Sequence, residues 1–443
     1  MGSSKIIEPK ILKGFRDSLP ETEIKKKAII GKLEKHFSSY GFVPIDTPVL
    51  EYTEVLLGKG GGETDKQIFH FKDNGERDVA MRFDLTIPFA RFLAAHLGEI
   101  ALPFKRFHID KVWRGENPQK GRFREFTQCD FDIVGVDNAE ADYEILSMMN
   151  SSFEMLGING YTFCVAHRGL FNAFLAHLGL EVSSIEILRI VDKLRKIGKE
   201  EVKQELVGLI KSEEKADMII SFITKDDPNE SFIATLDRLS SLCGGEIEHT
   251  SRMKRIYSYL QSAGISEHFT YDPSITRGLD YYTGIVYETF LDDLPQFGSV
   301  CSGGRYDNLA SLYVKEVIPG VGSSIGLDRL LAALAELGSP LLGQSSSADV
   351  LIFSMDESLR TWYNSLAIEM RKQGLRVDVY LMDNKKLSTQ FKYAETNHIP
   401  FALTCGSNEH DADKVSLKNL LTRETHPMIT LSEAVGIIQK EIN

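Results

Sequence analysis

The sequence predicts an α+β protein that ends in a separate α/β domain, and three observations carry this prediction. Alternating apolar and polar residues, which are typical of strands, recur on both sides of residues 169–262. Within 169–262 the apolar residues follow helical spacing, with almost no strand signal. After residue 348, strand and helix patterns alternate, which favours a mostly parallel or mixed sheet.

The predicted parts follow one another along the chain. A strand-rich part (1–168) precedes a helical insertion (169–262) and a second strand-rich part (263–337), followed by a linker (338–347) and a C-terminal domain (348–443). The linker lies in "LGSPLLGQSSSAD", where glycine, proline and serine follow an apolar helix pattern. In the C-terminal domain, the last expected strands are "PFALTCG" and "KVSLKNL", before a final helix.

The composition is that of an ordinary globular protein. The chain has 443 residues, 42% hydrophobic and 26% charged, which is enough for large buried cores. Its five cysteines lack C-x-x-C or paired-histidine spacing, so neither a disulfide framework nor a structural zinc site is indicated. No signal core or membrane-length apolar run is present, and we expect a soluble, cytoplasmic protein. The net charge of −12 argues against a general nucleic-acid coat.

A glycine-rich stretch, "GKGGGE" (58–63), invites comparison with phosphate-binding loops. It lacks the G-K-[ST] ending of a P-loop, and Glu63 stands where a dinucleotide fingerprint needs glycine. A mobile loop is therefore favoured over a nucleotide cradle.

The segment "KVWRGENPQKGRFREFTQCDFDIVG" (111–135) predicts a hairpin with cations at both ends of its loop. Two alternating strands flank a polar loop, with Arg114 before it and Arg122 and Arg124 after it. Guanidinium groups keep their charge and can form paired bonds to phosphate oxygens, so this arrangement suits a polyphosphate.

The second strand of this hairpin carries polar residues on one face. Period two places Arg124, Phe126, Gln128, Asp130 and Asp132 together, with Gln128 and Asp132 about 13 Å apart. An isolated strand of this kind is more often a solvated sheet face. That spacing also brackets a ligand the size of an amino acid.

The stretch "MRFDLTIPF" (81–89) favours a pocket over a solvated face. Arg82, Asp84 and Thr86 are expected to share one strand face, just before a helix that starts at a proline. Two strands that offer carboxylate and hydrogen-bonding groups predict a pocket floor.

Three later segments are ambiguous when each is taken singly. "TRGLDYYTG" (276–284) fits a salt-bridged turn or a site, and "SGGRYDNL" (302–309) is expected to form a Gly-Gly turn before a helix. "GVGSSIGLDRLLAALAELG" (320–338) is expected to form a glycine-rich turn that enters an apolar helix. Arg329 on that helix needs an anionic partner, either a structural carboxylate or a ligand.

Together these segments resemble the class II aminoacyl-tRNA synthetases, and specifically the histidyl-tRNA synthetase family. "FVPIDTPVLE" (42–51) resembles motif 1, "FKRFHIDKVWRGENPQKGRFREF" resembles motif 2 and "GVGSSIGLDRLL" resembles motif 3. "RGLDYYTG" and "SGGRYD" resemble the two histidine-specific signatures. The resemblance implies a catalytic domain on an antiparallel sheet, a helical insertion and an anticodon-binding-like C-terminal domain.

The resemblance implies ATP-dependent attachment of histidine to tRNA through histidyl-adenylate. The implied catalytic residues are Arg114, Arg277 and Arg329, and those binding ATP are Glu116, Arg122 and Phe126. The residues implied to bind histidine are Asp84, Leu85, Thr86, Gln128, Asp132, Arg277, Tyr281, Tyr282 and Tyr306. The implied partners are histidine, ATP, tRNA and a second copy of the chain, with Mg²⁺ held mainly by the ATP phosphates and no organic cofactor.

Asp84 and Asp132 depart from many bacterial relatives, which carry Glu there, while "NPQKGR" resembles the bacterial loop. Two alternatives remain. One is a non-catalytic, histidine-sensing regulatory paralogue, although such paralogues lack the anticodon module and usually lose phosphate-binding arginines. The other is a class II synthetase for another amino acid with a similar C-terminal domain.

Overall fold

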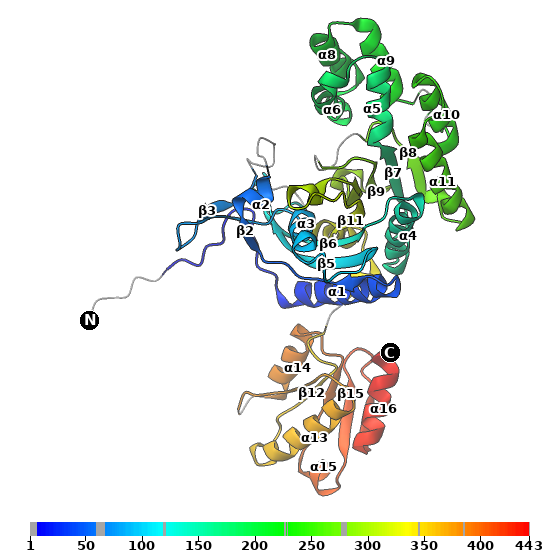
Figure 1. Ribbon diagram of the computed structural model, residues 1–443. Coiled ribbons are helices and arrows are strands. Elements are labelled where there is room, and N and C mark those ends of the chain that lie inside the picture. Colours follow the sequence, from blue (N-terminus) through cyan, green and yellow to red (C-terminus); the bar gives the residue numbers. More distant parts are fainter. Residues whose placement is uncertain are drawn as a thin grey trace. The chain divides into compact units, whose positions relative to one another are not determined.

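The computed structural model describes residues 7–58, 67–117, 121–225, 227, 229–275, 281–343, 346–383 and 386–442. The chain divides into two compact units. The first contains Ile29–Gly338 with the N-terminal segment up to Arg16, and the second contains Ser339–Asn443 with Asp17–Ala28. Each unit has its own sheet (Figure 1).

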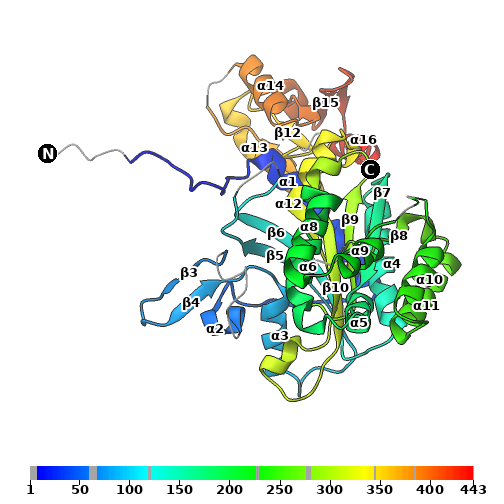
Figure 2. The ribbon, with the colours of Figure 1, turned by 90° about the horizontal axis from the view of Figure 1, so that it is seen from above.

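An eight-stranded sheet forms the centre of the first unit, in the order β1-β5-β6-β11-β10-β9-β7-β8 (Figure 2). The strands from β5 to β7 in this order pair antiparallel, and the edge strands β1 and β8 pair parallel to their neighbours. Their bounds are β1 Val43–Pro44, β5 Phe104–Trp113, β6 Glu125–Val134, β7 Tyr161–His167, β8 Phe269–Tyr271, β9 Ile285–Leu291, β10 Cys301–Tyr306 and β11 Gly320–Gly326.

The two faces of this sheet differ because side chains alternate along each strand. Phe107 on β5 and Phe131 on β6 are partners in register, and both rings contact Phe37 of α1 (Pro20–Ser39). Arg106 and Asp132, one position along, are also register partners and point to the opposite face. One face is therefore packed against helix, and the other carries buried charge.

Three further helices border this sheet. The side chain of Asn138 accepts from the backbone N–H of Ala141 at 2.9 Å and caps α4 (Ala139–Met155). Helix α12 (Leu327–Glu336) follows β11 directly. Helix α3 (Thr86–Ala95) begins shortly after a small second sheet.

The small sheet lies beside α3 and has the strand order β2-β4-β3. Its strands are β2 Leu50–Tyr52, β3 His70–Lys72 and β4 Asp78–Met81, and α2 (Thr53–Leu57) follows β2. "GKGGGE" lies outside the described residues except for its first glycine, so the predicted loop stays a prediction.

Helices alone form the described chain between β7 and β8, apart from short 3₁₀ turns. Serine side chains cap two of them, because Ser212 accepts from Lys215 N–H and Ser231 accepts from Ala234 N–H. The bounds are α5 Arg168–His177, α6 Ser184–Val191, α7 Leu194–Ile197, α8 Lys199–Ile210, α9 Glu213–Ile223, α10 Phe232–Leu242 and α11 Glu248–Ser262.

The second unit contains a mixed five-stranded sheet in the order β13-β12-β14-β15-β16. Its strands are β12 Val350–Ile352, β13 Val377–Val379, β14 Phe401–Leu403, β15 Val415–Asn419 and β16 Thr425–Ile429. Its helices are α13 Arg360–Lys372, α14 Leu387–Thr396, α15 Ser407–Asp411 and α16 Leu431–Ile442. Strand β16 was not predicted, since it is an edge strand that contains a proline and exposes most of its residues.

The turns predicted at 302–304 and 320–326 are wrong, because these residues form the central strands β10 and β11. Glycine runs are typical of turns, but glycine in a strand also marks a place where other atoms approach the backbone closely. Among the described residues, no helix has the length and apolarity needed to cross a membrane.

Candidate active site

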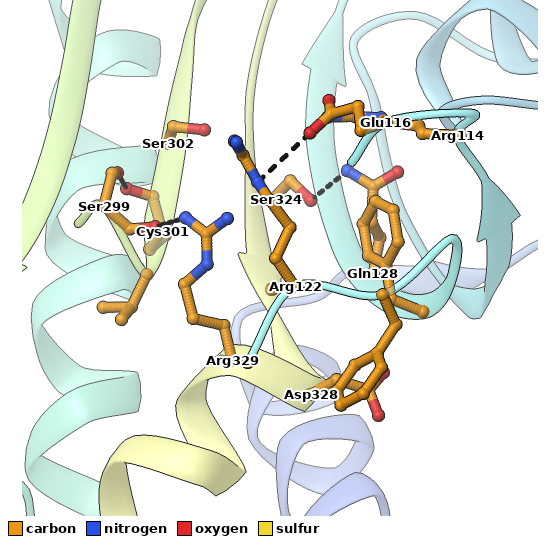
Figure 3. Close-up of a pocket in the computed structure, with 15 residues that line it drawn as sticks. Arg114, Glu116, Arg122, Gln128, Ser299, Cys301, Ser302, Ser324, Asp328 and Arg329 are labelled. Atoms are coloured by element: carbon orange, nitrogen blue, oxygen red, sulfur yellow. Dashed lines mark hydrogen bonds and ion pairs between the residues drawn. The ribbon is translucent and has the colours of Figure 1, made fainter. Parts of the chain in front are cut away.

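Arg114, Arg122 and Arg329 line one end of a pocket on the charged face of the large sheet, here called the guanidinium end (Figure 3). Arg329, in the first turn of α12, donates from Nη1 to the carbonyl of Ser299. Arg122 Nε lies 3.1 Å from Glu116 Oε2. Both arginines extend toward the same space in Figure 3, from a helix and from the end of the motif-2-like loop.

The guanidinium end holds more positive charge than its carboxylates balance. Burial lowers the pKa of Arg329, and the charges of Arg122 and Arg114 lower it further. No carboxylate of the described residues lies within ion-pairing distance of Arg329. The sequence left open whether the anionic partner of Arg329 is a carboxylate or a ligand, and this arrangement favours an anionic ligand.

Asp84, Asp130 and Asp132 lie farther along the same face, here called the carboxylate end. Asp132 Oδ2 lies 2.6 Å from Arg106 Nη2, and its Oδ1 accepts from the hydroxyl of Tyr306 at 2.6 Å. Asp132 is therefore held in place by Arg106 and Tyr306 before any ligand binds.

Asp84 is held by hydrogen bonds. Its Oδ1 accepts from Ile87 N–H at 3.0 Å, and its Oδ2 accepts from the Tyr281 hydroxyl at 3.2 Å. The Tyr281 ring also contacts the rings of Tyr282 and Tyr306, with centroids 5.0 and 5.9 Å away. Two of these packed tyrosines thus each bond one carboxylate, Tyr281 to Asp84 and Tyr306 to Asp132.

Burial raises the pKa of all three acids at this end, most clearly that of Asp130, whose pKa rises to about 7. Asp132 and Asp84 raise the pKa of Asp130 further by charge repulsion, while Arg106 lowers it. Burial also raises the pKa of Tyr282, so that its hydroxyl stays a neutral donor.

Glycines provide the room for these side chains. A Cβ atom on Gly322 would lie 1.9 Å from Asp132 Oδ1, and one on Gly320 would lie 2.4 Å from the Tyr306 ring. Gly322 is the register partner of Asp132 on β6. The glycines of β11 therefore allow large polar groups to lie directly on the sheet.

Asp328 joins the two elements that border the guanidinium end. Its Oδ2 accepts from Thr127 N–H on β6 at 2.6 Å, and its Oδ1 accepts from Arg16. The Arg16 guanidinium also lies 4.0 Å from the Phe123 ring centroid. The bonds of Asp328 hold the start of α12, and with it Arg329, against the start of β6.

Comparison with known proteins identifies the family to which this arrangement belongs. The model of the histidyl-tRNA synthetase family matches residues 14–330, and that of the anticodon-binding domain matches residues 349–441. The chain is a member of the histidyl-tRNA synthetase family.

Relatives match over nearly the whole chain. The chain is 51% identical to a histidine–tRNA ligase of Treponema denticola, over 99% of this chain and 100% of that protein. It is 45% identical to one of Rhodopirellula baltica, over 95% of each. The crystal structure of histidyl-tRNA synthetase from Nostoc has a TM-score of 0.86 and 31% identity, over 98% of this chain and 100% of that one. The predicted fold class and the family resemblance are confirmed.

The structure brings most of the predicted site residues of this synthetase together. The guanidinium end gathers Arg114, Glu116, Arg122, Phe126, Gln128 and Arg329. The carboxylate end gathers Asp84, Leu85, Thr86, Asp132, Tyr281, Tyr282 and Tyr306. Arg277 lies outside the described residues, and the roles of all these residues stay predictions.

The predicted strand face shared by Arg82, Asp84 and Thr86 is wrong. Strand β4 ends at Met81 and α3 begins at Thr86, so the three residues lie in different elements. Arg82 is fully buried and donates to the carbonyl of Thr47 at 2.6 Å, while its Nη2 lies 2.5 Å from Asp110. It therefore supports the sheet from outside the pocket.

Arg106 is the main residue that sequence reasoning missed. It is fully buried, pairs with Asp132 and lies 4.3 Å from the Phe89 ring centroid. Its alternation with Phe107 on a predicted strand was the available signal, but only the register shows which carboxylate it faces.

Asp46, His108 and Asp110 bring three possible metal-ligand atoms within 4.8 Å of one another. The geometry alone would fit a small cation. Arg82 already pairs with Asp110. Burial lowers the pKa of His108 most, and the charges of Arg106 and Arg82 lower it further, to about 4. Two buried guanidinium groups therefore disfavour a cation at this position.

Proposed function

We propose that this synthetase activates histidine with ATP and transfers it to tRNA in the pocket between the guanidinium and carboxylate ends. Histidine–tRNA ligase activity follows from relatives named for it over the full chain. The observation that carries the residue roles is Arg329, a partly buried cation beside two others and without a paired carboxylate among the described residues.

The guanidinium end is assigned to ATP. Attack of the histidine carboxylate on the α-phosphorus concentrates negative charge there, and fixed cations stabilise that charge. Arg114 and Arg277 would hold the α-phosphate, and Arg329 and Arg122 the phosphate tail. Glu116, now paired with Arg122 at 3.1 Å, would then be released to contact the adenine amino group, with Phe126 stacked on the base.

The carboxylate end is assigned to histidine. Asp84, Thr86 and Gln128 would receive the ammonium group, because their oxygens are acceptors. Asp132, with Tyr306 and the pair Tyr281 and Tyr282, would read the imidazole ring, which needs an acceptor and a hydroxyl at its two nitrogens.

The synthetase family uses a divalent metal with ATP, and we assign this role to Mg²⁺. The carboxylates that line the guanidinium end are Glu116, which pairs with Arg122, and Asp328, which is held by Arg16 and Thr127. Phosphate oxygens are therefore the fitting main ligands, and bound Mg²⁺ would neutralise phosphate charge. A homodimer and a cytoplasmic location are further parts of the proposal.

Two measurements test the proposed function. Purified protein should exchange pyrophosphate into ATP only when histidine is present, and it should charge a mixed tRNA pool with histidine alone. Absence of exchange would favour the regulatory alternative. Charging with a different amino acid would show that the carboxylate end has been assigned to the wrong substrate.

A further inference from the structure

Asp130 lies in the middle of the carboxylate end and has no role in the proposed function. It occupies the position on β6 between Gln128 and Asp132, on the same face, and is 2% exposed. Its Oδ1 atom has no hydrogen-bond partner among the residues that the structure describes. Such a buried acceptor is destabilising and calls for an explanation.

Gln128, two positions earlier, shows the same feature. Its amide nitrogen donates to Ser324 Oγ at 2.8 Å, which leaves Oε1 buried and without a partner in the described chain. Same-face neighbours on a strand lie about 7 Å apart. Ser324, the register partner of Asp130, lines the pocket together with Gln128, which places the two unpaired oxygens beside that pocket. Asp84 is near enough to Asp130 for their charges to interact.

Buried acceptors beside one pocket fit a ligand group that carries positive charge and N–H donors. We propose that Asp130 also accepts from the α-ammonium group of histidine, beside Asp84, Thr86 and Gln128. The inference rests on the proposed function, which already assigns Asp84 and Gln128 to that group. Asp132 is less suited, because Arg106 lies 2.6 Å away and balances its charge.

The charges around Asp130 favour a cation beside it. The groups that face it are Arg106 and His108 from β5, Gln128 and Asp132 from β6, Ser324 from β11, Cys301 from β10, Asp84 before α3, and Tyr281 and Tyr282 before β9. Arg106 is the one cation in this described set at neutral pH, because the pKa of His108 is lowered to about 4. Asp130 and Asp132 thus share the Arg106 guanidinium, while the charge of Arg114 also acts on Asp84.

Binding of the ammonium group should therefore release a proton. With a pKa of about 7, Asp130 is largely protonated at pH 6 in the free protein. A bound cation favours the ionised carboxylate, so the affinity for an ammonium ligand should fall as pH falls from 8 to 6. Without an ammonium group, a ligand gains nothing from this ionisation.

The test compares two histidine analogues by calorimetry at pH 8. Histidinol carries the ammonium and imidazole groups, and 3-(imidazol-4-yl)propionate lacks the ammonium. Asp130→Asn should weaken histidinol binding at least tenfold and change propionate binding less than twofold. The matched control is Asp110→Asn, a half-buried acid on the neighbouring strand, which should leave both affinities within twofold. Equal losses of both ligands in Asp130→Asn, or no loss of either, would overturn the inference.

A second measurement uses the wild-type protein and does not depend on the variant folding. Calorimetry at pH 6.5 in buffers of different ionisation enthalpy gives the protons released on binding. After subtraction of the protons lost by each ligand's own imidazole, histidinol should release more protons than the propionate, and an equal corrected release would overturn the inference. Failure of the wild-type protein to bind either histidine or histidinol would instead contradict the proposed function.

Discussion

At the guanidinium end Arg329 bonds a backbone carbonyl and has no paired carboxylate among the described residues, whereas at the carboxylate end Asp132 is held by both Arg106 and Tyr306. The first end is partly open, and the second is almost completely buried. One end is thus left with charge that a ligand must balance, and the other is preorganised by contacts within the protein. Under the proposed function, the difference teaches that binding a phosphate chain and recognising a side chain impose different demands on the same sheet.

Removal of the unbalanced charge should give the largest effect. Arg329→Ala is expected to lower kcat/KM for ATP in pyrophosphate exchange by about 10²–10³-fold, because it removes a cation at developing negative charge. The melting temperature should change little, since no paired carboxylate of the described chain loses its partner. Lys111→Ala removes an exposed cation from β5 and should stay within twofold. A similar loss in both variants would contradict the assignment.

Substitutions at the carboxylate end should change the KM for histidine much more than the KM for ATP. Asp132→Asn is expected to raise KM for histidine by about 10²-fold and KM for ATP by less than threefold, because the acceptor for the imidazole is lost. Steady-state exchange kinetics measure both constants. Equal changes would count against Asp132 as the imidazole acceptor. Tyr306→Phe removes one hydrogen bond to Asp132 and should reproduce the pattern at about tenfold.

The charge at the carboxylate end should lower the stability of the free protein. The folded pKa of Asp130, about 7, exceeds the ordinary unfolded value of about 3.9, so stability from this group is full below about pH 4 and is lost as pH rises through 7. Asp130→Asn should therefore raise the free energy of unfolding of the ligand-free protein at pH 8 by on the order of 2 kcal/mol. Urea denaturation at pH 8 and pH 5 should show the gain shrinking at pH 5. A constant gain would mean that ionisation is not its cause.

Substitution of two glycines of β11 should change the KM for histidine differently, because only Gly322 lies against Asp132. A methyl group on Gly322 would meet Asp132 Oδ1 at 1.9 Å, so Gly322→Ala should raise KM for histidine by about tenfold. At Gly326 the nearest atom is 3.6 Å away, an ordinary contact, and Gly326→Ala should change KM for histidine less than twofold. Equal values in the two variants would show that room for Asp132 is not the role of Gly322.

The β5–β6 hairpin was predictable, because its alternation of apolar and polar residues is long and regular. The same period placed Gln128 and Asp132 correctly on one face. Strands β10 and β11 were misjudged as turns, because their small residues lack the bulky β-branched pattern from which strands are recognised. Arg82 was misplaced because local alternation cannot show where a strand ends.

The sequence by itself determined the family and the fold class, since motifs and periodicity are local properties of the chain. Tertiary structure decided which charges meet. Arg106 and Asp132 are far apart in sequence and become partners only through strand register, and Gly322 leaves no room for a side chain because Asp132 lies against it. These outcomes depend on long-range pairing. They leave Arg329 at the guanidinium end without a paired carboxylate among the described residues, and they pair Asp132 at the carboxylate end with Arg106 and Tyr306.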